Sequence, residues 1–81
     1  MIVYVKGGSP VCDEFRSAVE AYAAEWGVLV RVVDVSSSPR LRKSFGRRVP
    51  LLEVNGEIVT EGEVWPEKLD AVLHEVIGGG E

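Results

Sequence analysis

The stretch that decides the fold covers residues 2–14 and reads IVYVKGGSPVCDE. Its first four residues are apolar and rich in β-branched side chains, which predicts a buried strand at 2–5. Ser9-Pro10 is typical of a helix start, because serine caps free N–H groups and proline suits the first helical position. Asp13 and Glu14 favour the first turn of that helix. We therefore expect a strand, a tight loop and a helix in direct succession.

The predicted helix continues to Gly27 and leads to a second strand. Gly27 is a typical helix end, and the β-branched run at 28–35 predicts a strand. Apolar residues recur along the helix at spacings of three and four, and they are Val11, Phe15, Ala18, Val19, Tyr22, Ala23 and Trp26. Because β-α-β connections are right-handed crossovers, the two strands should be parallel.

The second half of the chain predicts a short helix, a hairpin and a closing helix. Ser38-Pro39 repeats the cap-and-proline start, so a helix with a charged outer face is expected at 39–45 and should stop at Gly46. Asn55-Gly56 separates two strand-like runs and is a strong signal for an antiparallel hairpin. Pro66 opens the last helix, whose apolar stripe comprises Leu69, Val72, Leu73, Val76 and Ile77.

This order, β-α-β-α-β-β-α, predicts an α/β fold. We expect a three-layer α/β/α sandwich around a mixed four-stranded sheet of order 2-1-3-4. The first and last helices should pack on one face, and the short middle helix on the other. One domain is expected at 1–77, followed by a flexible Gly-rich tail at 78–81.

Composition limits the classes of function. The formal net charge of −4 argues against binding to nucleic acid or to an anionic membrane surface. Met1 leads directly into the first predicted strand, so we expect no signal peptide and a cytoplasmic location. A single cysteine excludes an internal disulfide and a cysteine-based zinc site. The chain has no Gln and one Asn, which favours a thermophilic source, and we expect a monomer.

The loop between the first strand and the first helix is the expected place for chemistry. It lies at the carboxyl end of a central parallel strand, where α/β sheets bind ligands. The helix N-terminus stabilises negative charge, so a thiol there is more reactive at neutral pH. The Lys6 ammonium would add to this effect.

The run from Val3 to Cys12 resembles the entry sequence of the glutaredoxins, which belong to the thioredoxin-fold superfamily. In that family a strand, a lysine, a glycine and a Cys-Pro-aromatic-Cys motif follow in this order. Val49-Pro50 resembles the family's Val-Pro pair, whose proline is cis, and the hairpin and closing helix fall in register. Cys12-Asp13-Glu14 and Trp65-Pro66 are similar to features of a small bacterial group of glutaredoxin-like proteins.

This resemblance implies a thiol–disulfide oxidoreductase of cell redox homeostasis, with glutathione as co-substrate and with no bound cofactor or metal. It places Ser9 at the attacking cysteine and Cys12 at the resolving cysteine. The backbone of Val49, beside Pro50, would pair with the cysteinyl part of glutathione or with an extended peptide. Lys6 would meet a glutathione carboxylate or stabilise a thiolate.

Pro10 and Val11 complete the substrate-binding residues that the resemblance implies. Three departures from the family pattern lower the expected activity. Ser9 is essentially un-ionised at neutral pH and forms no disulfide. Val11 replaces the aromatic residue that walls the glutathione groove. Glu61-Gly62-Glu63 stands in place of the family's Gly-Gly-Asp/Ser signature, and its acidic side chains would repel the γ-glutamyl carboxylate.

Several residues allow two interpretations. Cys12 is either a reactive thiol or a small residue buried in the core. Ser9 is either the natural capping residue or a laboratory replacement for cysteine. Pro50 is predicted to be cis, against an ordinary trans proline at a strand start. Trp65 either lines a partner site or covers the sheet edge, and His74 is expected at the surface or half-buried, without a metal-binding role.

Two functions follow. The first is a glutaredoxin-like thiol–disulfide protein with an atypical Ser-Pro-Val-Cys site, whose partner is glutathione or a protein bearing a thiol or disulfide. The second is a binding module that keeps the Val49-Pro50 groove for a peptide or protein and has lost the redox step.

Overall fold

The computed structural model describes residues 1–78 and contains the predicted strands and helices in the predicted order. They are β1 (Ile2–Val5), α1 (Pro10–Trp26), β2 (Arg31–Asp34), the 3-10 helix η1 (Val35–Ser37), α2 (Pro39–Phe45), β3 (Leu51–Val54), β4 (Glu57–Glu61), α3 (Pro66–Leu73) and the π-helix η2 (His74–Gly78). The predicted Gly-rich tail lies outside the described residues from residue 79 onward. None of the helices within residues 1–78 is both long and apolar enough to span a bilayer.

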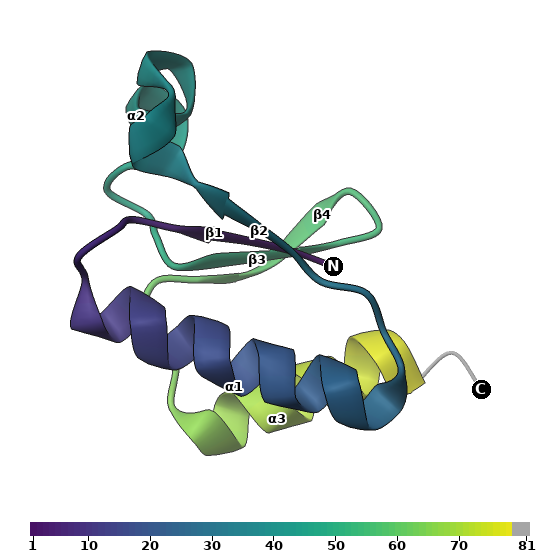
Figure 1. Cartoon of the computed structure of the whole chain (residues 1–81). Coiled ribbons are helices and arrows are strands. Elements are labelled where there is room, and N and C mark those ends of the chain that lie inside the picture. Colours follow the sequence, from purple (N-terminus) through teal and green to yellow (C-terminus); the bar gives the residue numbers. More distant parts are fainter. Residues whose placement is uncertain (79–81) are drawn as a thin grey trace.

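The four strands form one mixed sheet, as predicted (Figure 1). The strand order is β2-β1-β3-β4. β1 runs parallel to β2 and antiparallel to β3, and β3 pairs antiparallel with β4 through the Asn55-Gly56 turn. Asn55 and Gly56 both have positive φ, at 52° and 82°, which a two-residue hairpin of this kind requires.

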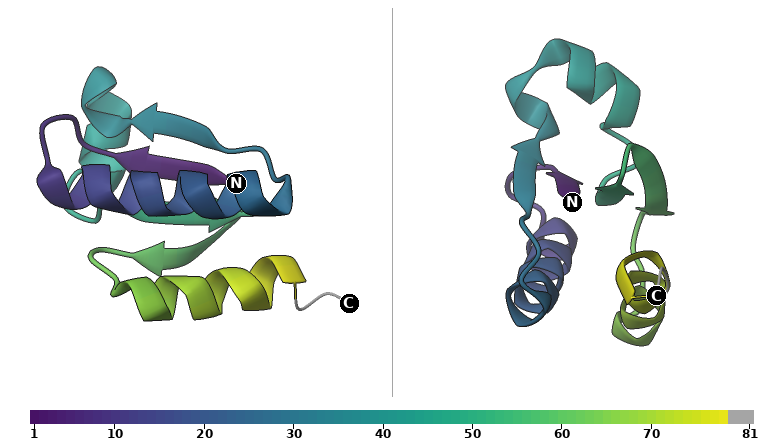
Figure 2. Two further views of the ribbon diagram at one scale, coloured as in Figure 1. Left: turned by 60° about the horizontal axis from the view of Figure 1, so that its bottom comes forward. Right: turned by 90° about the vertical axis from the view of Figure 1, so that its right-hand side faces the viewer.

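The helices lie on the predicted sides of the sheet. α1 and α3 lie together on one side, and α2 lies on the opposite side (Figure 2). On the α2 side, the rings of Tyr4 and Phe45 are 4.9 Å apart between centroids. This arrangement is consistent with the thioredoxin-like fold that the resemblance implies.

The core lies between the sheet and the two helices α1 and α3. Alternate residues of β1 point into it, because successive side chains of a strand face opposite sides; Val3 is 0% exposed and Val5 is 8% exposed. The remaining buried members of this cluster are Cys12, Phe15, Val19, Tyr22, Leu52, Leu69 and Leu73. The predicted apolar stripes of both helices therefore supply most of the core.

β2 is shorter than the predicted strand at 28–35. A strand pairs only as far as its neighbour extends, and β1 begins at Ile2, which lies opposite Arg31. Before that point, the Val28 amide donates to the Ala23 carbonyl at the end of α1. After it, the Asp34 side chain accepts from the Ser36 amide and starts the turn η1.

The end of the closing helix is held against α1 by side chains. The Tyr22 hydroxyl and His74 Nδ1 are 2.8 Å apart, and the Trp26 ring meets the His74 ring edge-on at 5.2 Å. The side chain of His74 is 55% exposed, so this residue lies at the surface, as predicted, and its ring joins two helices.

Replacing a core leucine should destabilise the protein far more than replacing an exposed one. Leu52 is 0% exposed and Leu29 is 89% exposed. Leu52→Ala should lower the free energy of unfolding by about 2–5 kcal/mol, because it leaves a cavity, and Leu29→Ala by no more than about 0.5 kcal/mol. Urea unfolding of both variants measures the difference. Equal losses would contradict the core described above.

Candidate functional site

The helix α1 begins with a side-chain cap from Ser9. The Cys12 amide donates to Ser9 Oγ at 3.3 Å, and the Asp13 amide donates to the Ser9 carbonyl at 3.0 Å. Pro10 occupies the first helical turn, as predicted. Gly8 has a φ of 83°, a conformation that glycine adopts without a steric penalty, and it turns the chain from β1 into the helix.

Cys12 faces the interior of the protein. It is 1% exposed and belongs to the core cluster, and the Lys6 amide approaches its Sγ at 3.5 Å. Ser9, at the position that the resemblance gives to the attacking cysteine, is half-buried. The accessible position of the motif therefore carries a hydroxyl, and the thiol lies beneath it. Of the two interpretations of Cys12, the structure agrees with the buried small residue.

Asp34 lies against the motif loop at Gly7, and no sequence motif predicts this. The Ser36 hydroxyl donates to Asp34 Oδ1 at 2.6 Å and the Ser36 amide at 2.9 Å. These bonds, joined by one from the Gly7 amide, hold the pKa of the Asp34 carboxyl below its usual range, although desolvation opposes them. A Cβ at Gly7 would lie 2.9 Å from Asp34 Oδ2, so a larger residue at position 7 would displace this carboxylate. The only signal in the sequence is an aspartate at the end of a parallel strand next to β1.

The Val49–Pro50 peptide bond is cis, as predicted. The Gly62 amide donates to the Pro50 carbonyl at 2.8 Å and to the Arg48 carbonyl at 3.1 Å. Pro50 is fully buried and Val49 is half-buried. Among the backbone hydrogen bonds that residues 1–78 make outside helices and strands, none uses the amide or carbonyl of Val49.

An ion pair closes this segment against the end of β4. Arg48 Nη2 lies 2.9 Å from Glu61 Oε1, and the hydrogen bond from this guanidinium holds the pKa of the Glu61 carboxyl below its usual range. Glu61 is thus already paired within the chain. Glu63 forms no ion pair among the described residues. The predicted repulsion of a γ-glutamyl carboxylate would therefore come mainly from Glu63.

Lys6 lines a cationic hollow on the α2 side of the loop. The hollow measures about 210 Å³, and Arg42 and Arg47 join Lys6 in its lining. Three cations around one small hollow are suited to a carboxylate or another compact anion. The family resemblance implies a carboxylate contact for Lys6 alone. It does not extend to the two arginines, because a run of basic residues on a short helix is typical of a solvated face.

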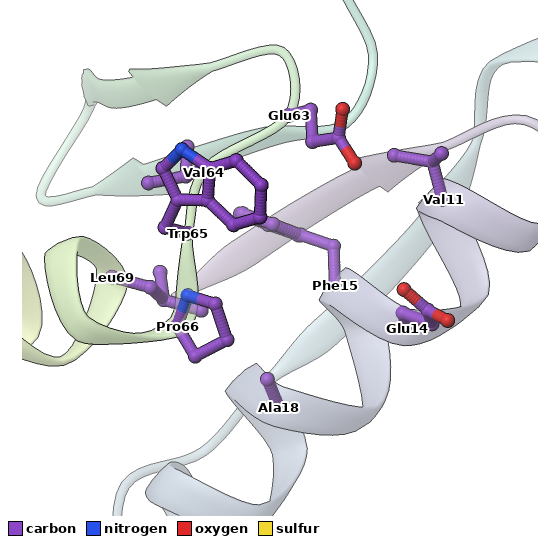
Figure 3. A pocket seen from close by; sticks show the side chains of 9 residues that line it. All are labelled: Val11, Glu14, Phe15, Ala18, Glu63, Val64, Trp65, Pro66 and Leu69. Atoms are coloured by element: carbon purple, nitrogen blue, oxygen red, sulfur yellow. The ribbon is translucent and has the colours of Figure 1, made fainter.

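An apolar groove lies on the other side of the motif (Figure 3). It measures about 250 Å³ and runs between α1 and the loop from β4 to α3. Val11 contributes to one wall and Trp65 to the other. Trp65 is 75% exposed, so it lines this groove and does not cover the sheet edge. Neither Cys12 nor Pro50 lines it.

The described residues offer no constellation for a metal ion. Within residues 1–78, no group of three or more His, Cys, Asp or Glu side chains lies close enough together to hold one.

The Cys12 thiol should be protected from alkylation in the folded protein. Iodoacetamide at pH 7 should modify Cys12 roughly 100-fold more slowly in buffer than in urea, because reaction requires local opening. Ser17→Cys places a thiol at an exposed position of the same helix and should react rapidly in buffer. Intact mass spectrometry over time follows both reactions. If Cys12 were modified as fast as Cys at position 17, the thiol would be accessible.

Asp34 should stabilise the loop only while it is ionised. Because its pKa is lower in the folded than in the unfolded protein, its contribution is present above an ordinary aspartate pKa of about 3.9 and is lost as pH falls through the folded value. Urea unfolding between pH 7 and pH 2.5 should therefore show a smaller acid-induced loss of stability in Asp34→Asn than in the unchanged protein. Glu57→Gln, which alters an exposed carboxylate on the hairpin, serves as the control. An unchanged acid profile in Asp34→Asn would contradict the role of this carboxylate.

Comparison with protein families agrees with the geometry of the site. A family model described as Glrx-like, the glutaredoxin-like domain (DUF836), matches residues 1–74. A comparison with curated proteins gave no match. The matched range includes the capped motif at Ser9–Cys12, the cis Val49–Pro50 bond and α3. The chain belongs to the glutaredoxin-like domain (DUF836) family.

Proposed function

We propose that this glutaredoxin-like protein binds glutathione or an extended peptide bearing a thiol or disulfide beside Val49 and Pro50. It carries out little or no thiol–disulfide exchange of its own. A cytoplasmic location, where thiols stay reduced, is part of this proposal.

The observation that carries the proposal is the burial of the only thiol. Cys12 is 1% exposed, and thiol–disulfide exchange requires a thiolate that can reach the disulfide sulfur. The accessible position belongs to Ser9, whose hydroxyl accepts a hydrogen bond from the Cys12 amide. This hydroxyl caps a helix and offers no nucleophile comparable to a thiolate.

Binding is supported by groups on both sides of the motif. The amide and carbonyl of Val49 are not used by the loop hydrogen bonds of the described residues, so they can pair with an extended ligand as a further strand would. The hollow lined by Lys6, Arg42 and Arg47 can hold a carboxylate of that ligand. Glutathione and a peptide both supply an extended backbone and a carboxylate.

A second candidate is slow redox chemistry at Cys12, which family membership and the position of this residue in the first turn of α1 favour. After local opening, the Cys12 thiolate would attack one sulfur of glutathione disulfide. One S–S bond breaks, one S–S bond forms to Cys12, and one glutathione leaves as its thiolate. With no second cysteine in the chain, the adduct is resolved only by an external thiol.

Restoring a thiol at position 9 should restore exchange. Ser9→Cys should raise the glutathione-dependent reduction of a small mixed disulfide by at least about tenfold over the unchanged chain, since the thiolate and not the hydroxyl is the nucleophile. Ser17→Cys adds the same group outside the motif, and its rate should stay close to that of the unchanged chain. Steady-state rates of mixed-disulfide reduction by the three proteins measure these differences.

The outcomes separate the two candidates. Activity in Ser9→Cys alone supports a binding groove that lacks its nucleophile. Comparable activity in the unchanged chain, lost in Cys12→Ser, supports exchange at Cys12. If Ser9→Cys and Ser17→Cys are equally slow, the groove does not serve glutathione, and the proposal fails for that ligand.

A further inference from the structure

The groove between α1 and the β4–α3 loop has an apolar floor and an open rim. Phe15 and Leu69 are 5% and 4% exposed and form part of its lining. Val11 and Trp65 are 37% and 75% exposed, so a ligand could cover both. A volume of about 250 Å³ is smaller than most sites for whole drug-sized molecules, and it suits a single long side chain.

Two carboxylates stand at this apolar groove. Glu14 comes from α1 and Glu63 from the β4–α3 loop, and both contribute to the lining. Figure 3 shows Glu14 on the α1 wall with Val11, and Glu63 on the loop wall with Trp65, its carboxylate pointing towards Val11. The ion pairs of residues 1–78 join other residues, and neither Glu14 nor Glu63 takes part in one. Within residues 1–78, the two carboxylates beside the exposed Trp65 indole therefore have no cationic partner.

We propose that this groove binds an arginine or lysine side chain from a partner protein that lies across the motif. The aliphatic stem of such a side chain would cover Phe15 and Leu69, as long basic side chains cover apolar surface elsewhere. Its charged head would reach Glu14 and Glu63 and could lie against the face of Trp65. This inference rests on the proposed function, since it specifies a side chain of the peptide that would pair with the backbone of Val49.

Charge complementarity selects this occupant over the obvious alternatives. A γ-glutamyl carboxylate would meet Glu63 with like charge. A purely apolar side chain would fill the floor and leave both carboxylates partly desolvated without a partner, which is costly. A basic side chain would cover the apolar floor with its aliphatic stem and pair its charge with the two carboxylates. The cations of Lys6, Arg42 and Arg47 lie around a different hollow, so the two sides of the motif have opposite charge.

The test compares two blocked pentapeptides, acetyl-Ala-Val-Arg-Val-Ala-amide and the same peptide with Gln in place of Arg. Each is titrated into the 15N-labelled full chain and followed by NMR. The Arg peptide should shift the indole signal of Trp65 and the amides of Glu14 and Glu63. The indole of Trp26, which stacks on Tyr22 at a centroid distance of 5.5 Å, is the internal control and should not move.

Variants then test the carboxylates. Glu63→Gln should weaken binding of the Arg peptide by about threefold, as expected for one partly exposed ion pair, and should leave binding of the Gln peptide unchanged. Glu57→Gln removes the same charge from the hairpin and should alter neither. Added salt should weaken binding of the Arg peptide alone.

Failure of this inference differs from failure of the proposed function. Equal shifts with both peptides, or no shift at Trp65, overturn the basic-side-chain site. If the Arg peptide shifts the amide signals of Val49 and Cys12 but not the signals of Trp65, Glu14 and Glu63, the proposed binding beside Val49 stands and this inference is wrong. If the groove responds and Val49 does not, the basic-side-chain site stands and the proposed edge loses its support.

Discussion

The start of α1 at Ser9 determines how the rest of the site is arranged. Once the Ser9 hydroxyl accepts the Cys12 amide, the helical period fixes the direction of each following side chain. Position 12 then turns inward with Phe15 and Val19, and position 11 turns outward to the groove. The burial of the thiol and the apolar wall at Val11 are therefore two consequences of one cap. The Asp34 carboxylate lies beside Gly7 of this loop and so connects the loop to the end of β2.

The sequence predicts most of the fold, because its signals are local. Ser-Pro pairs mark the starts of α1 and α2, and Asn55-Gly56 marks the hairpin. The length of β2 escaped prediction, since it depends on where β1 begins and not on the β-branched run itself. Strand ends are set by the partner strand, which a single run of residues does not reveal.

The candidate site is predictable only in part, because some of its residues come together only in the folded chain. Ser9, Cys12 and Pro50 belong to motifs that can be recognised along the chain. The fold brings Asp34 next to Gly7 and places Arg42 and Arg47 around one hollow with Lys6. For the arginines nothing nearby in the sequence indicates this, and for Asp34 the signal is only its place at the end of a strand. In the sequence Glu61 and Glu63 are equivalent acids, and only the structure distinguishes them, because Glu61 pairs with Arg48.

The net charge of −4 conceals a separation of charge. The segment 40–48 carries five basic residues and no acidic one, and two of the five join Lys6 around a hollow of about 210 Å³. A hollow of that size concentrates positive potential on one small anionic group. Binding along a nucleic-acid backbone instead uses basic contacts to many successive phosphates.

A serine at position 9 can keep the fold intact whether or not the chain carries out thiol–disulfide exchange. A residue at position 9 has two separable tasks, which are to cap the helix and to attack a disulfide. Serine is among the best capping residues and cannot perform the second task, so the exchange loses its nucleophile while α1 keeps its cap. The cis Val49–Pro50 segment is held by Gly62 and by the Arg48–Glu61 pair, none of which involves the motif. The Val49–Pro50 segment and the motif at Ser9–Cys12 are thus held by different contacts, so the proposed binding edge does not depend on a thiol at position 9.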